Sequence, residues 1–168
     1  MMRPKDIAKS GTEHGIQSAL FCWANVAMNH GFELADAWAE GALLPIRADD
    51  ALPTIPELRW LHAVPNGGSR GDDAKSRAIR GNALKAEGVK PGVSDVFLPV
   101  KSWSQWDGER RTVNYCGLYV EMKKPGGKPT VEQVEFGAFV SAQGYYWTVC
   151  DDWRDAADII EKYLWGKL

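Results

Sequence analysis

Three charged side chains in the second half of the chain are placed where they could take part in hydrolytic chemistry. Residues 115–124, YCGLYVEMKK, have the composition of a buried strand, and alternate side chains of a strand share one face, so Glu121 and Lys123 are expected side by side. Asp95 opens a second expected strand, residues 93–100, after a Pro-Gly turn. Carboxylates from adjacent strands suit a hard cation such as Mg²⁺, and the lysine could act on a water or on a phosphate.

Each of these residues also has an ordinary structural interpretation. Asp95 could be only a turn residue. Glu121 and Lys123 could form an ion pair on an exposed sheet face, which would be worth about 0–1 kcal/mol. The apolar neighbours of Glu121 favour burial instead, and a buried carboxylate is costly unless it meets a cation or a metal.

The remaining segments predict an α/β fold with a mixed central sheet flanked by helices. Apolar residues at three- and four-residue spacing predict a helix over residues 10–31, with Ser10 or Thr12 as its N-cap and Gly31 at its end. Another helix is expected over residues 130–144, with Thr130 as its cap. Further helices are expected over 73–87 and 153–166, and further strands over 59–68 and 145–151.

Length and composition indicate one globular domain, residues 1–168. The net charge of −2 neither supports nor excludes a nucleic-acid partner. The three cysteines lie far apart in apolar stretches, which is typical of core residues in a reducing compartment rather than of a zinc site. No apolar run approaches the roughly 20 residues of a membrane span, so we expect no membrane partner and a cytoplasmic location, in the host cell if the protein is virus-encoded.

The acidic motif resembles a known nuclease core. Asp95 followed by Glu121-Met122-Lys123 is similar to the D…(D/E)xK core of the PD-(D/E)XK, restriction-endonuclease-like superfamily, and the context resembles its virus-type replication-repair nuclease (VRR-NUC) domains. The similarity covers nearly the whole chain in five ordered segments: EHGIQ, VPNGGSR, GNALKAEGVKPGVSDVFLP, GLYVEMKKPGGKPTVEQVEF and GYYWTVCDDWRDAADIIEKYL. It implies that residues 32–57 and 101–114 are insertions in a single VRR-NUC-like domain. Ser94 stands where the motif has a proline, which is not a ligand.

The resemblance implies a restriction-endonuclease-like fold and a set of site residues. The set comprises a helix acid, two strand carboxylates, a backbone carbonyl, the motif lysine and a supporting glutamine: Glu13, Asp95, Glu121, Met122, Lys123 and Gln133. The first four would bind Mg²⁺ or Mn²⁺. Two of them have simpler explanations, because Glu13 could be a first-turn acid favoured by the helix dipole and Gln133 could be only a capping residue.

A local excess of positive charge precedes Asp95 and could bind DNA. The basic residues of this segment are Arg70, Lys75, Arg77, Arg80, Lys85 and Lys90. They could hold phosphates on either side of a scissile bond, which would give contacts to backbone and shape rather than to bases. A solvated helix face would show the same pattern.

Two tryptophans, Trp103 and Trp106, lie in a polar segment with Lys101, Arg110 and Arg111. Exposed aromatic side chains among basic residues could stack on unpaired bases. They could equally lie in a homodimer interface, where Trp and Arg are favoured.

The resemblance implies a Mg²⁺- or Mn²⁺-dependent endonuclease of DNA repair or phage replication, acting on branched or structured DNA. Four-way (Holliday) junctions are one expected substrate, and a homodimer would supply the two symmetric cuts. The alternatives are a non-catalytic DNA-binding or scaffold domain, and a nuclease directed to flaps, ends or RNA.

Overall fold

The computed structural model describes residues 2–48, 51–65, 82–84 and 86–168. The helices are α1 (Pro4–Ala8), α2 (Glu13–His30), α3 (Phe32–Glu40), the 3₁₀ helix η1 (Pro56–Trp60), α5 (Val131–Ala142) and α6 (Trp153–Leu164), and residues 82–84 and 86 are also helical. The strands are β1 (His62–Ala63), β2 (Val96–Leu98), β3 (Ser102–Trp103), β4 (Val113–Tyr115), β5 (Leu118–Met122) and β6 (Tyr146–Cys150).

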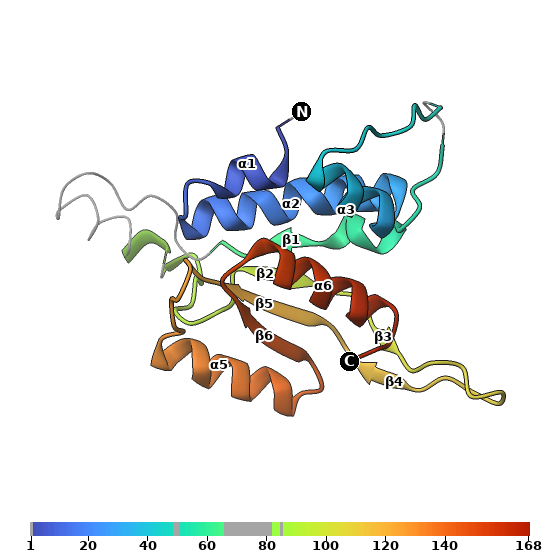
Figure 1. Ribbon diagram of the computed structural model, residues 1–168. Coiled ribbons are helices and arrows are strands. Elements are labelled where there is room, and N and C mark those ends of the chain that lie inside the picture. Colours follow the sequence, from blue (N-terminus) through green and yellow to red (C-terminus); the bar gives the residue numbers. More distant parts are fainter. Residues whose placement is uncertain (1, 49–50, 66–81, 85) are drawn as a thin grey trace.

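A four-stranded sheet in the order β1-β2-β5-β6 forms the centre of the structure (Figure 1). Strand β2 runs antiparallel to both β1 and β5, whereas β5 and β6 are parallel and are joined through α5. Strands β3 and β4 form a separate two-stranded ribbon. The predicted α/β fold with a mixed sheet and flanking helices is confirmed.

The two faces of the sheet have different coverings. Helices α2 and α6 lie over one face, and α5 lies over the other (Figure 1). The face under α2 and α6 is the apolar core and contains the fully buried residues Val96, Leu98, Leu118, Val120 and Met122. Because side chains alternate along a strand, the residues between them must point toward α5.

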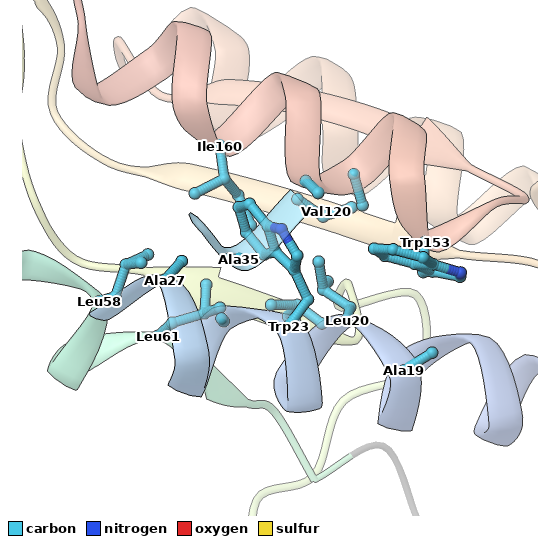
Figure 2. Packing of buried hydrophobic residues seen from close by; sticks show 14 of the residues in the cluster. Ala19, Leu20, Trp23, Ala27, Ala35, Leu58, Leu61, Val120, Trp153 and Ile160 are labelled. Carbon is cyan, nitrogen blue, oxygen red and sulfur yellow. The ribbon is translucent and has the colours of Figure 1, made fainter. Parts of the chain in front are cut away.

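Helix α2 supplies the other half of the core. Its buried residues Ile16, Leu20, Trp23 and Ala27 recur at three- and four-residue spacing, as the sequence predicts. Trp23 stacks on Phe32 with ring centroids 5.8 Å apart. Figure 2 shows Trp23 and Leu20 projecting from α2 into the space beneath Ile160 of α6.

Some elements differ from the sequence-based prediction. The strand expected over 93–100 is limited to β2. Of the strand expected over 59–68, residues 59–60 belong to η1 and residues 62–63 form β1, while residues 66–68 lie outside the described part of the chain. Pro56 begins η1, where its fixed φ suits the first helical position and its missing N–H is not needed. Helix α1 was not expected, and within the segment 32–57 helix α3 adds Trp38 to the core. No helix in the described part of the chain is both long and apolar enough to cross a membrane.

The α2 core predicts a clear contrast between two leucine substitutions. Leu20 is fully buried, so Leu20→Ala should lower the free energy of unfolding by about 2–5 kcal/mol, because a cavity remains beside Trp23. Leu43 is 89% exposed, and Leu43→Ala should change it by no more than about 0.5 kcal/mol. Urea denaturation measures both, and equal losses would contradict this description of the core.

Candidate active site

Glu121 of β5 and Lys123, the residue that follows β5, lie on the face of the sheet that points away from the α2–α6 core. Both are buried, with 0% of Glu121 and 7% of Lys123 exposed to solvent. Lys123 Nζ donates a hydrogen bond to Glu121 Oε1 over 2.8 Å. The alternative of an ion pair on an exposed sheet face is therefore wrong, because the pair has been removed from water.

The two oxygens of the Glu121 carboxylate have different surroundings. Oε1 accepts hydrogen bonds from Lys123 Nζ and from Gln133 Nε2. Oε2 is buried and has no hydrogen-bond partner among the residues that the structure describes. An unpaired buried carboxylate oxygen is costly, so this atom is the strongest local sign of a group that the site binds.

Burial raises the pKa of Glu121 to about 7. Desolvation is the main cause, because it disfavours the charged carboxylate. The negative charge of Asp95 raises the pKa further, as does the hydrogen bond that a protonated Glu121 can share with the Asp95 carboxylate. The hydrogen bond and positive charge of Lys123 act in the opposite direction but do not offset the burial. The site thus holds a carboxyl group that is easily protonated near neutral pH unless further positive charge is added.

Asp95 lies next to Glu121, across the pairing of β2 with β5. Val96 is paired with Val120, so one further step of the same antiparallel register brings Asp95 opposite Glu121. Asp95 Oδ2 accepts a hydrogen bond of 3.0 Å from the Met122 backbone N–H. This bond fixes Asp95 to the same strand that carries Glu121.

Gln133 closes the first turn of α5 and also reaches Glu121. Its Oε1 accepts a hydrogen bond from Thr130 N over 2.8 Å, and Thr130 Oγ1 accepts one from Gln133 N, which completes the predicted capping box. Its Nε2 remains available and donates to Glu121 Oε1. The capping and site interpretations of Gln133 are therefore compatible, since its amide oxygen caps the helix and its amide nitrogen binds Glu121.

Glu13 is further from the two strand carboxylates. It is the first residue of α2, behind the N-cap Thr12, and its side chain is 54% exposed. Its Oε1 lies 4.0 Å from Lys123 Nζ, so Glu13 and Glu121 both lie near the same ammonium group. The predicted site residues therefore come together from three places: Glu13 from α2 lies near Lys123, and Asp95 from the start of β2 and Gln133 from α5 lie near Glu121.

The structure provides a carboxylate pair rather than a complete set of three acids. The described part of the chain contains no group of three or more Asp, Glu, His or Cys side chains arranged to hold a metal ion. The predicted role of Glu13 as a third ligand therefore stays a prediction. The unpaired Glu121 Oε2 and the neighbouring Asp95 carboxylate nevertheless fit a hard cation such as Mg²⁺, which binds through one or two carboxylates and keeps several waters.

Most of the predicted DNA-binding residues lie outside the described part of the chain: Arg70, Lys75, Arg77, Arg80 and Lys85. Lys90 is described and exposed, just before the turn that leads to Asp95. Sequence reasoning missed Asp151, whose Oδ2 accepts a 2.7 Å hydrogen bond from Gly126 N and so holds the turn that follows Lys123. No local spacing indicates this contact, because the two residues are far apart in the sequence.

The raised pKa of Glu121 predicts how the stability of the metal-free protein changes with pH. In the unfolded chain this carboxyl ionises near 4.5, and in the folded protein near 7, so between these values the folded state binds more protons. The free energy of unfolding should then fall by about 3 kcal/mol as the pH rises through that window. Glu121→Gln should remove this decrease, and Glu109→Gln, at an exposed position, should keep it. Urea denaturation in the presence of a chelator at several pH values measures how the free energy of unfolding changes with pH. If Glu121→Gln shows the same pH dependence as the wild type, Glu121 is not the group responsible for it.

Comparison with known proteins supports the fold. No family model matches the chain, and no curated protein is similar to it. A solved structure described as a "VRR_NUC domain protein" superposes with a TM-score of 0.51 at 18% identity, over 91% of this chain and 88% of the other. The likeness confirms the expected resemblance at the level of the fold: the chain has an α/β fold like that of a VRR-NUC domain.

Proposed function

We propose that this protein is a metal-dependent nuclease that hydrolyses phosphodiester bonds of DNA. The observation that carries the proposal is the buried Glu121 carboxylate, which has one oxygen held by Lys123 and Gln133 and the other unpaired beside Asp95. The fold shared with a VRR_NUC domain protein supports the same function. A hydrolase of this kind needs a charged, water-poor site, which the burial of this pair supplies.

The ion would be Mg²⁺ or Mn²⁺. Asp95, Glu121 and the backbone carbonyl of Met122 would hold it, with Glu13 as a more distant acid. When bound, such an ion supplies an activated water and neutralises charge on the phosphate. Its positive charge would also keep Glu121 ionised despite burial.

The remaining residues would position the reacting groups. Lys123 is held by Glu121 at 2.8 Å, which keeps its ammonium group at the site, where it would orient a water or neutralise a phosphate oxygen. Gln133 satisfies the same carboxylate oxygen as Lys123, which leaves Oε2 free to face the ion. In this arrangement Oε1 of Glu121 would hold Lys123 and Gln133, and Oε2 would bind the ion.

A non-catalytic DNA-binding or scaffold domain is the main alternative. A scaffold with this fold would lose nothing if apolar side chains stood at both positions 121 and 123, because a buried ion pair is often no more stable than apolar residues of similar volume. The presence of a buried acid and lysine favours catalysis. A nuclease acting on flaps, ends or RNA is a second alternative, and the substrate test below separates it from a junction enzyme.

Two charge-removing substitutions test the proposed chemistry. Glu121→Gln and Asp95→Asn should each lower the rate of DNA cleavage by about a hundredfold or more and weaken Mn²⁺ binding, while each new amide oxygen can still accept the existing hydrogen bonds. Gel assays with Mg²⁺, Mn²⁺ or chelator measure cleavage, and calorimetry measures Mn²⁺ binding. Glu109→Gln, on the exposed hairpin, is the matched control. Wild-type turnover in either site variant at saturating metal would overturn the active-site assignment.

The proposed substrate is branched DNA, including four-way junctions, cut by a homodimer. One site cuts one strand, so two symmetric cuts need two protomers related by a two-fold axis. Trp103, Trp106 and Trp165 are 45%, 59% and 50% exposed, which makes them available for a protomer contact or for stacking on unpaired bases. The basic segment 70–90 would bind the phosphates on either side of the cut.

Sedimentation and cleavage measured together test the dimeric form. At micromolar concentration the protein should sediment as a dimer and should cut a labelled four-way junction symmetrically in both strands. Linear duplex, flap and RNA substrates serve as comparisons in the same assay. A strict monomer that nicks flaps and leaves junctions intact would reject the junction-resolving dimer, and it would leave the metal-dependent chemistry standing.

A further inference from the structure

Ser94, the residue before Asp95, is hydrogen-bonded to β6, the edge strand that lies beyond β5 in the sheet. Its side chain is fully buried, and its Oγ accepts a hydrogen bond of 3.0 Å from Trp147 Nε1 on β6. Trp147 pairs with Tyr119 of β5, two residues before Glu121 on the same face. The indole therefore reaches from β6 across the α5 face of the sheet to the start of β2.

The same indole ring lies directly against the backbone of α5. A Cβ added to Gly137 would collide with three atoms of the Trp147 ring, so only glycine allows the helix to approach this closely. Helix α5 carries Gln133 one turn earlier, on the side that reaches Glu121. Trp147 thus contacts both the strand start that carries Asp95 and the helix that carries Gln133.

A second close contact joins the turn before Asp95 to the beginning of α5. Gly92 has a φ of +84°, which L side chains rarely adopt, and a Cβ there would come within 2.6 Å of the Glu132 carbonyl oxygen. The turn therefore packs on the helix residue that immediately precedes Gln133. Two independent contacts, at Gly92 and through Ser94, place the segment before Asp95 against α5 and β6.

We propose that Trp147 is a positioning residue of the site. Its indole N–H holds Ser94, and through Ser94 it sets the distance of the Asp95 carboxylate from Glu121 and Gln133, with Gly92 and Gly137 as the spacers that allow the approach. The importance of this positioning for cleavage rests on the proposed nuclease function. The positioning of Asp95 does not depend on that function. Asp95 Oδ2 accepts a hydrogen bond from the Met122 N–H, and this bond reports the position of Asp95 in the absence of a substrate.

The first test measures that bond in the metal-free protein by NMR. Trp147→Phe removes the N–H donor and keeps a ring against Gly137, so exchange of the Met122 amide hydrogen should accelerate by about threefold to tenfold. The Tyr146 amide, bonded to the Gly117 carbonyl, should exchange at its wild-type rate. Trp60→Phe, at a 60% exposed position on η1, is the matched control and should change neither rate.

The second test uses Ser94→Ala, which removes the same bond from its other end. It should accelerate Met122 exchange to the same extent, and the double variant with Trp147→Phe should add nothing, because both substitutions delete one interaction. An unchanged Met122 rate in both single variants overturns the proposal. Equal acceleration at Met122 and Tyr146 also overturns it, since that result means global destabilisation.

Cleavage kinetics then connect the positioning to the reaction. Both variants should lower kcat by about threefold to tenfold and leave KM for DNA unchanged, because the misplaced group is Asp95 and not a DNA contact. A wild-type kcat combined with accelerated Met122 exchange would overturn the link to catalysis. If the wild-type protein cleaves no nucleic acid, the proposed function fails, while the exchange experiment still decides whether Trp147 positions Asp95.

Discussion

The removal of the Glu121 carboxylate from water is the constraint on which the rest of the site depends. A buried carboxylate loses its hydration and must regain favourable contacts from the protein. Lys123 and Gln133 satisfy one oxygen, and the raised pKa of Glu121 shows that they do not offset the whole cost. The apolar core on the other face of the sheet, where Val96, Leu98, Leu118, Val120 and Met122 are fully buried, supplies stability that offsets this cost.

The alternation of side chains along β5 allows one short strand to serve both purposes. Val120 and Met122 enter the core under α2 and α6, whereas Tyr119 and Glu121 point toward α5. Pairing to β2 on one side and β6 on the other fixes the register, and a slip by one residue would exchange the core face for the site face. The position of the carboxylate is therefore determined by the burial of its apolar neighbours.

Local rules predict part of this arrangement from the sequence. The shared face of Glu121 and Lys123, the helical face of Trp23 and the cap at Thr130 all follow from short-range periodicity and are confirmed. The bond between Trp147 and Ser94 spans 53 positions of sequence, so no local pattern indicates it. The burial of Lys123 was likewise not predictable, because a lysine near a strand end normally reaches solvent, and here its ammonium group lies within hydrogen-bonding distance of Glu121 and 4.0 Å from Glu13 of α2.

The double use of Gln133 makes the start of α5 and the site a single cooperative unit. When the first turn of a helix frays, its capping side chain is released, and such a cap contributes about 1 kcal/mol. Here the same release would withdraw the amide that holds Glu121, because Thr130 and Glu121 are bonded to opposite ends of one side chain. Fluctuations of a helix end, which in most proteins affect only that end, would in this chain change the charge balance of the buried carboxylate.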